Sequence, residues 1–160
     1  MVHVRPYEAA DWDFVLSLAP RLALGIPPWR DKRAMLATVQ EWITDSIARR
    51  GEPSEVFVAV GERGERLGFA SVSDETHFTG TVQAYIGELA VVQEAEGTGI
   101  GKALVRACEQ WARHRGHRFL SLATGAANAR ALAFYRHLGF HDEDVKLVKV
   151  LEERTDSQSP

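Results

Sequence analysis

Residues 94–105 read EAEGTGIGKALV and place three glycines on alternate positions, 97, 99 and 101, at the start of a predicted helix. Glycine inside a helix or strand costs about 0.5–1 kcal/mol relative to alanine, so this cluster needs a reason in backbone geometry or close approach. A strand pattern, Glu88–Val92, comes just before it. A strand that runs through glycines into a helix offers unpaired backbone N–H groups to an anion. The stretch therefore predicts either an anion-binding helix start or a helix that packs closely on a sheet.

Two well-known nucleotide-binding motifs do not fit this stretch. A P-loop needs a glycine five positions before Gly101 and a Ser or Thr after Lys102, but Glu96 and Ala103 stand there. A dinucleotide fingerprint needs a glycine at position 102 or 104, where the chain has lysine and leucine. The glycines must therefore serve another kind of site.

The pattern on both sides of the glycines predicts a mixed α/β domain. Strand patterns cover residues 2–5, 55–62, 66–74, 82–92, 119–124 and 145–151, and helical patterns cover 11–22, 31–50, 99–115 and 128–138. The resulting order, βααβββαβαβ, indicates a mixed sheet with helices on its two faces. Asp11 is expected to cap the first helix, and Trp42 to lie on the apolar face of the second. We expect a single domain over residues 1–151 and a disordered tail over 152–160.

Composition excludes several classes of partner. The chain has 160 residues, 45% of them hydrophobic, and a net charge of −3, which gives no basic field for nucleic acid. It has no signal-peptide pattern and no run of 18 apolar residues, so we expect a cytoplasmic protein that does not engage a membrane. The single cysteine, Cys108, shares helical spacing with Ile100 and Leu104, which predicts a buried thiol and not a nucleophile.

A second motif, NARALAFYRHLGF at residues 128–140, follows the glycines. Two parts of the chain resemble the signature segments of the GNAT superfamily of N-acyltransferases. The first is ELAV at residues 88–91 followed by GTGIG at 97–101, and the second is this pattern of Asn, Phe-Tyr and Leu-Gly-Phe. That family's acyl-CoA motif is Arg or Gln, any two residues, Gly, any residue, Gly or Ala. Gly99 and Gly101 fit this motif, but Glu96 places a carboxylate where the family has Arg or Gln. The resemblance covers nearly the whole chain.

The resemblance implies acetyl-CoA as co-substrate and a mostly antiparallel sheet in which two parallel strands, 88–92 and 119–124, splay apart around the cofactor. Backbone N–H groups of residues 97–101 would hold the pyrophosphate, and one at about Leu89 or Ala90 would meet the oxyanion where the strand bulges. Asn128 would meet the pantetheine amides, cap the next helix, or do both. The cofactor-binding residues implied are Leu89, Ala90, Val91, Gly97, Thr98, Gly99, Ile100, Gly101, Lys102, Asn128 and Tyr135.

Two side chains are candidates for proton transfer. The resemblance makes Tyr135 the acid for the departing thiolate, although ordinary pKa values of about 10 for tyrosine and 8.5 for a thiol favour a hydrogen bond over full transfer. The alternative for Tyr135 is an aromatic that packs beside Phe134. Glu88 is the candidate base if a β-bulge turns its side chain into the acceptor cleft. The alternative is that Glu88 is a solvated or salt-bridged carboxylate without a catalytic role. The tentative substrate-lining residues are Trp29, Arg30, His77 and Phe78.

These features predict an enzyme that transfers acetyl from acetyl-CoA to a primary amine of a small molecule or peptide, by direct attack in a ternary complex and without a metal. A non-catalytic acyl-CoA-binding regulatory module is the alternative, because it would need the glycines but neither Tyr135 nor Glu88. A structural domain with vestigial glycines would need none of them. Exposed strands and the habits of the family make a homodimer a further expectation.

Overall fold

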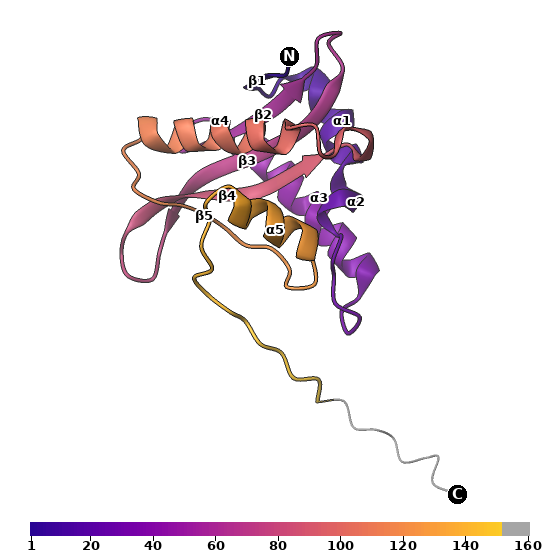
Figure 1. Ribbon diagram of the computed structural model, residues 1–160, viewed down its shortest axis with the longest axis vertical. Helices are drawn as coiled ribbons and strands as arrows, with labels where there is room; N and C mark the ends of the chain where they lie inside the picture. Colours follow the sequence, from indigo (N-terminus) through magenta and orange to yellow (C-terminus); the bar gives the residue numbers. More distant parts are fainter. Residues whose placement is uncertain (152–160) are drawn as a thin grey trace, which may run out of the picture.

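The computed structural model describes residues 1–151 and shows one five-stranded sheet with helices on both faces (Figure 1). The strands, in both sequence and spatial order, are β1 (His3–Pro6), β2 (Ser54–Val60), β3 (Arg66–Thr76), β4 (Val82–Val91) and β5 (Leu120–Leu122). Strands β1 to β4 pair antiparallel, and β4 and β5 pair parallel. The predicted mixed sheet is confirmed. The predicted tail, residues 152–160, lies outside the described residues.

The helices connect the strands much as predicted. The helical segments are η1 (Ala9–Asp11), α1 (Trp12–Ser17), α2 (Ala19–Leu22), α3 (Lys32–Ala48), η2 (Gln93–Ala95), α4 (Ile100–His114) and α5 (Ala129–His137). Asp31 caps α3 by accepting a hydrogen bond from the Ala34 N–H. Within residues 1–151, no helix combines the length and apolar character that crossing a membrane requires.

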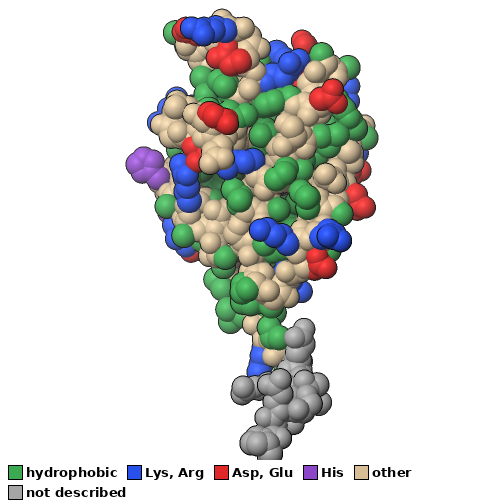
Figure 2. All heavy atoms as spheres, turned by 90° about the vertical axis from the view of Figure 1, so that its right-hand side faces the viewer, with side chains coloured by type: hydrophobic (Ala, Val, Ile, Leu, Met, Phe, Trp, Pro, Cys, Tyr) green, Lys and Arg blue, Asp and Glu red, His purple; other side chains and the backbone are tan. Residues whose placement is uncertain are grey.

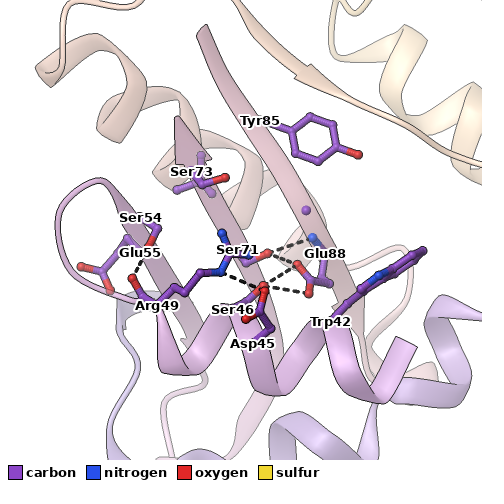
Figure 3. A pocket seen from close by; sticks show the side chains of 12 residues that line it. Trp42, Asp45, Ser46, Arg49, Ser54, Glu55, Ser71, Ser73, Tyr85 and Glu88 are labelled. Atoms are coloured by element: carbon purple, nitrogen blue, oxygen red, sulfur yellow. Dashed lines mark hydrogen bonds and ion pairs between the residues drawn. The ribbon is translucent and has the colours of Figure 1, made fainter. Parts of the chain in front are cut away.

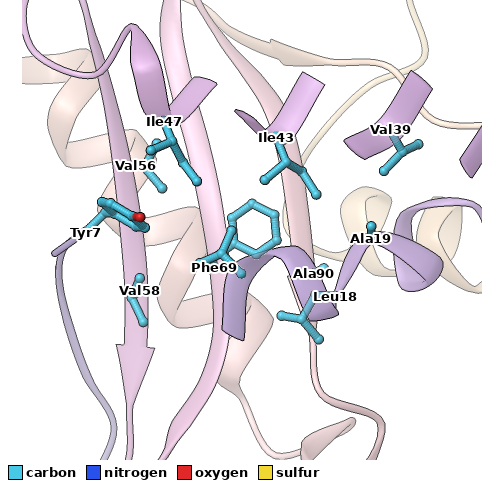
Figure 4. Packing of buried hydrophobic residues seen from close by; sticks show 11 residues of the cluster. Tyr7, Leu18, Ala19, Val39, Ile43, Ile47, Val56, Val58, Phe69 and Ala90 are labelled. Atoms are coloured by element: carbon cyan, nitrogen blue, oxygen red, sulfur yellow. The ribbon is translucent and has the colours of Figure 1, made fainter. Parts of the chain in front are cut away.

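One core lies between the sheet and helices α1 to α3 (Figure 4). Val39, Ile43 and Ile47 of α3 follow one another at four-residue intervals and are buried. They form one cluster with Val56 of β2 and Phe69 of β3. Each such side chain contributes about 1.5–3 kcal/mol when it is fully buried, so this stripe holds α3 against the sheet.

A second core lies on the opposite face, under α4. Ile100, Leu104 and Cys108 recur every four residues along this helix and are buried against the sheet. The Cys108 thiol is free, and burial raises its pKa to about 12. The predicted role of Cys108 as a packed core thiol is therefore confirmed.

Asp11 does not cap the first helix with its side chain as expected. Its buried carboxylate accepts hydrogen bonds from Arg5 at 2.8 and 3.0 Å, from Arg66 at 2.6 Å and from the Glu8 N–H at 2.8 Å. Burial alone would raise the pKa of Asp11, but the hydrogen bonds from the two arginines outweigh it and hold the pKa well below its usual range. The carboxylate thus ties β1, β3 and the first helical turn together.

The predicted last strand, residues 145–151, is wrong for the single chain. This segment follows α5 in an extended run that leads away from the body of the molecule (Figure 1). A strand requires a hydrogen-bonded neighbour, and no described strand pairs with this segment. Its apolar side chains remain exposed as a result.

Candidate active site

A β-bulge in the middle of β4 sets the direction of the β4 side chains at the site. Ser71 of β3 pairs with Glu88, whereas the next residue, Val72, pairs with Ile86, so Gly87 is an extra residue on β4. Ile86 and Leu89 consequently both join the core under α4, and Glu88 points to the opposite face. The sequence predicted a bulge near here but could not place it.

Glu88 lies on the wall of a pocket between α3 and the bulged part of the sheet (Figure 3). The pocket has a volume of about 210 Å³. Only 4% of Glu88 is exposed, so its carboxylate meets solvent or a ligand only through this opening. The residues that line the pocket are Trp42, Asp45, Ser46, Arg49, Ser54, Glu55, Ser71, Val72, Ser73, Tyr85, Gly87 and Glu88.

Two serines hold the Glu88 carboxylate in place. Ser46 of α3 donates to it at 2.9 Å, and the Ser71 hydroxyl donates to the other side. Burial raises the pKa of Glu88, and the hydrogen bonds from Ser71 and Ser46 only partly oppose that effect. A carboxylate with a raised pKa is a stronger base than an ordinary one, so the arrangement suits proton abstraction near neutral pH.

The pocket is bounded by residues that the sequence did not assign to it. Trp42 was expected in the core but is 52% exposed and forms one wall, with Tyr85 on another. The sequence held one signal that this face of α3 borders a pocket. Ser46, one turn after Trp42, puts a polar residue on an otherwise apolar helical face. None of Trp29, Arg30, His77 and Phe78 lines this pocket.

Those four residues occupy two other places. Trp29 and Arg30 lie exposed in the loop before α3. The ring of His77 packs on Phe78 with centroids 4.1 Å apart, in the turn between β3 and β4. The His77 Nε2 atom is 3.9 Å from the Glu143 carboxylate, so this turn faces the segment after α5.

The glycine cluster has two separate structural reasons. Gly97 and Gly99 have φ values of +75° and +87°, the left-handed region in which side chains other than glycine are strained. Gly101 lies in the first turn of α4, where an added Cβ would come within 3.0 Å of the Phe134 ring. Conformation therefore explains the first two glycines, and packing of α4 against α5 explains the third.

The start of α4 presents backbone donors beside this loop. The first intrahelical bond runs from the Ala103 N–H to the Gly99 carbonyl at 3.1 Å. The N–H groups of Ile100, Gly101 and Lys102 therefore have no partner within the helix. The N–H of Thr98 already donates to the Ala95 carbonyl at 3.3 Å, so it is not a free donor as the sequence suggested.

Strands β4 and β5 pair over only a short length. Their parallel register covers Ala84–Ile86 against Leu120–Leu122, while β4 continues to Val91. Pairing stops at the residue before the bulge, so Leu89, Ala90 and Val91 have no partner in β5. This arrangement leaves one edge of β4 unpaired beyond the bulge, as expected for strands that splay.

Asn128 and Tyr135 belong to α5. The Asn128 side chain accepts a hydrogen bond from the Ala131 N–H at 3.2 Å and so caps this helix. Tyr135 contacts Phe134 and Phe140 edge to face, and burial raises its pKa to about 12. Tyr135 is therefore protonated near neutral pH and can donate a hydrogen bond there. It does not line the Glu88 pocket.

Glu96, which departs from the expected motif, is paired with two arginines. Its carboxylate contacts Arg21 of α2 and Arg130 of α5. Arg21 also donates from Nε to the Val91 carbonyl at 3.2 Å, at the end of β4. The three side chains carry a net positive charge next to the glycine loop.

The carboxylate of Asp74 in β3 has structural partners of its own. Asp74 accepts from Arg115 at 2.6 and 2.9 Å and lies 2.7 Å from His117 Nε2. The hydrogen bond from Arg115 is the main reason that the pKa of Asp74 is lowered. Among residues 1–151, no three His, Cys, Asp or Glu side chains are grouped so that they could hold a metal ion.

Comparison with known proteins gives consistent matches. The model of the acetyltransferase (GNAT) family matches residues 16–140. An aminoglycoside N(6')-acetyltransferase type 1 of Klebsiella aerogenes is 33% identical over 143 residues, which is 86% of this chain and 88% of that protein. An L-methionine sulfoximine/L-methionine sulfone acetyltransferase of Pseudomonas aeruginosa is 33% identical over 112 residues, which is 70% of this chain and 63% of that protein.

A similar fold is found among solved structures. A putative acetyl transferase from Pyrococcus furiosus superposes with a TM-score of 0.75 over 94% of this chain and all of that one, at 24% identity. At that identity the likeness concerns the fold alone.

Proposed function

This chain belongs to the GNAT family of acetyltransferases, and we propose that it moves the acetyl group of acetyl-CoA to an amine bound in the pocket at Glu88. The observation that carries this proposal is the position of Glu88, a buried carboxylate with a raised pKa on the wall of an open pocket. We also propose that residues 1–151 act as one domain, since the family match lies within them and a single sheet joins them.

The residues at the glycine loop fit an extended anionic cofactor. The N–H groups at the start of α4 and the positive end of the helix dipole favour a pyrophosphate there. Added Cβ atoms at Gly97 and Gly99 would meet no other atom within 4 Å, so bare backbone faces open space. The open edge of β4 suits an arm that pairs like an added strand, and Asn128 is the proposed contact for the amides of that arm. When bound, acetyl-CoA supplies an activated acyl carbon.

Glu88 would act as the general base. An amine that arrives as an ammonium ion must lose a proton before it can attack, and a carboxylate with a raised pKa can accept that proton directly or through a water. Ser46 and Ser71 fix the carboxylate and so limit the reorganisation that proton transfer requires. The backbone N–H groups of Leu89 or Ala90, beyond the bulge, are the candidates to stabilise the oxyanion.

Tyr135 would assist departure of the thiolate. Its raised pKa, about 12, makes complete proton transfer to a thiolate unfavourable, so it would donate a hydrogen bond to the sulfur. The resulting stabilisation is modest compared with that from the base.

The acceptor would be a small cationic amine. Three carboxylates, of Asp45, Glu55 and Glu88, line the pocket, while Arg49 is paired with Asp45 at 2.9 Å. Trp42 and Tyr85 add flat apolar surface suited to a ring. A volume of about 210 Å³ admits one amine-bearing end of a molecule, with the remainder in solvent. The matched aminoglycoside acetyltransferase makes aminoglycosides the first compounds to test.

The test is a coupled assay of free CoA thiol with purified protein, acetyl-CoA and a panel of amines that includes aminoglycosides, polyamines and amino acid analogues. Acetylation of at least one amine, lost in Glu88→Gln, is the expected result. Turnover that persists undiminished in Glu88→Gln would refute the assigned base. Failure to bind acetyl-CoA would refute the function itself.

A further inference from the structure

A second carboxylate lies on the same face of the sheet as Glu88. Ser73 and Tyr85 pair across β3 and β4 and are the last pair of these strands to line the Glu88 pocket (Figure 3). Side chains alternate between the two faces along a strand, so Glu75, two residues after Ser73, points to this face as well. Ser71, which pairs with Glu88, precedes Glu75 by roughly 13 Å along β3. The two carboxylates therefore lie in line, one inside the pocket and one beyond its edge.

The Glu75 carboxylate is held by neutral donors and is not paired with a cation. Gln83, its partner on β4, is only 6% exposed and donates from Nε2 to the Glu75 Oε2 atom at 3.2 Å. The Ser121 hydroxyl of β5 donates to the same oxygen at 3.3 Å. Among residues 1–151, no Lys, Arg or His forms an ion pair with this carboxylate. Its other oxygen, Oε1, accepts no side-chain hydrogen bond from those residues.

Glu75 and Glu88 share this arrangement, which distinguishes them from carboxylates with a structural role. Glu88 is likewise held by neutral groups, the hydroxyls of two serines. Asp11 and Asp74, by contrast, are paired with arginines. A carboxylate that is partly buried without a cation carries a desolvation cost, which an incoming cation can offset. The two glutamates are therefore suited to bind cationic groups of a ligand.

Tyr85 lies between the two carboxylates along β4. It follows Gln83 by two residues on the same face, and Glu88 comes after the bulge. Burial is the main reason that the pKa of Tyr85 is raised, and the charges of Glu75 and Glu88 add to it, in that order. The ring thus gives a flat, partly buried surface over which a ligand can pass from one carboxylate to the other.

The rest of this side of the molecule offers no general attraction for a polycation. Figure 2 shows acidic and basic side chains intermingled on the side that carries α1, α2 and α3. The net charge of the whole chain is only −3. A field of one sign would draw any cation toward the surface, but a mixed surface leaves recognition to individual groups. Recognition of a second cation therefore depends on Glu75 itself.

We propose, resting on the proposed function, that Glu75, Gln83 and Ser121 form a second cation subsite, so that the preferred acceptor carries two amines far apart. One amine gives a proton to Glu88 and forms the new N–C bond while the C–S bond of acetyl-CoA breaks and CoA leaves as the thiolate. The second amine stays protonated and pairs with Glu75. The chain between the amines crosses Tyr85 and spans roughly 13 Å, the spacing of four residues along a strand.

The test compares α,ω-diamines with amino alcohols of the same chain length, from 1,4-diaminobutane and 4-amino-1-butanol to 1,10-diaminodecane and 10-amino-1-decanol. Release of free CoA thiol gives kcat/KM for each compound. For the longest pairs, the diamine should exceed the amino alcohol about tenfold, because only the diamine brings a second charge to Glu75. The shortest diamine should show little advantage, because its second amine cannot reach that residue. The advantage should shrink at high salt.

Glu75→Gln is the decisive variant. Its amide oxygen can still accept from Gln83 and Ser121, so the network is retained while the charge is lost, and thermal unfolding checks that the variant is folded. The advantage of the long diamines should fall to about twofold or less. Glu41→Gln is the matched control, because it removes one charge from an exposed position of α3 outside the pocket lining. It should keep the full advantage.

Calorimetric titration of the same compounds in the presence of CoA, which has no acetyl group to transfer, measures binding without turnover. Tighter binding of the long diamines that is lost in Glu75→Gln supports the subsite. Equal binding of diamines and amino alcohols by the wild type, or an advantage that survives in Glu75→Gln, would overturn it. An equal loss for both classes of compound in Glu75→Gln would show a structural role and would also overturn it. Turnover of no amine at all would overturn the proposed function, and the titration would still decide the subsite.

Discussion

Ser71 and Glu88 are joined by two hydrogen bonds that run in opposite directions. The Ser71 hydroxyl donates to the Glu88 carboxylate, and its oxygen accepts from the Glu88 N–H at 2.9 Å. The bulge at Gly87 makes this possible, because it turns the side chain and the N–H of Glu88 toward the same serine. One residue of β3 therefore orients both the backbone and the carboxylate of the proposed base, and Ser46 of α3 adds a further hydrogen bond to that carboxylate.

Replacing Glu88 by glutamine should reduce kcat by about 100-fold or more, because general base catalysis contributes roughly that much. The variant should also lose the acidic limb of the pH profile, in which wild-type activity falls as the carboxylate takes up a proton.

Stability separates this loss from misfolding. The folded-state pKa of Glu88 is raised, so the wild type loses stability as pH rises through that pKa, whereas the glutamine variant has no such titration. Urea unfolding at pH 8 should find Glu88→Gln at least as stable as the wild type. A clearly less stable variant would contradict the burial argument.

Ser71→Ala should move the acidic limb of kcat/KM to higher pH by about one unit, because the hydrogen bond that favours the charged carboxylate is lost. Ser73→Ala is the control, since Ser73 lines the same pocket but makes no hydrogen bond to Glu88. If the acidic limb of kcat/KM stays at the same pH in Ser71→Ala, a group other than Glu88 determines that limb.

Tyr135→Phe should lower kcat about tenfold, the value of one hydrogen bond in the transition state. The KM for acetyl-CoA should change little, because the aromatic contacts with Phe134 and Phe140 remain. Steady-state kinetics measure both constants, with Tyr7→Phe, in the core under α3, as the control. A loss above a thousandfold would show that full proton transfer is required.

Gly101→Ala should destabilise the protein by about 1 kcal/mol, because the new Cβ would lie 3.0 Å from the Phe134 ring. The smaller side chain of Phe134→Leu should remove that penalty when the two changes are combined. Thermal unfolding of the four proteins in this double-mutant cycle measures the coupling. Additive effects would rule out the contact as the reason for the glycine.

Asp11→Asn should cost about 2–3 kcal/mol of unfolding free energy at pH 7, because it leaves Arg5 and Arg66 without their charged partner. The lowered pKa of Asp11 means that this stabilisation is present above the unfolded pKa of about 3.9 and is lost only at strongly acidic pH. Denaturant titrations at several pH values test this. The exposed neighbour Asp13 gives the control, Asp13→Asn, which should change little.

The sequence predicted those features that depend on local periodicity. The four-residue spacing of Ile100, Leu104 and Cys108 identified α4 and its buried face. The glycines at 97, 99 and 101 indicated a constrained helix start, which the left-handed φ values and the Phe134 contact explain. Local rules suffice where backbone geometry alone restricts the residue type.

Features that need two segments at once could not be predicted. Placing the bulge at Gly87 requires the register of β3 against β4, which no single stretch contains. Trp42 lies three residues after the buried Val39, a spacing that predicts the same buried helical face. A pocket lies between Trp42 and the sheet, however, so the side chain is half exposed. Residues 145–151 have the composition of a strand, but a strand also needs an edge to pair with.

The extra residue at Gly87 also has a consequence for how this protein can diversify. It determines the direction of the Glu88 side chain, and it lies where the pairing of β4 with β5 ends. A change in β4 would therefore alter the acceptor pocket and the proposed cofactor site together. Most of helix α3 is free of that constraint, because Trp42, Asp45 and Arg49 face the pocket without a hydrogen bond to Glu88, while Ile43 and Ile47 hold the helix in the core. New acceptor preferences should therefore arise in related lineages through substitutions on α3, with β4 left unchanged.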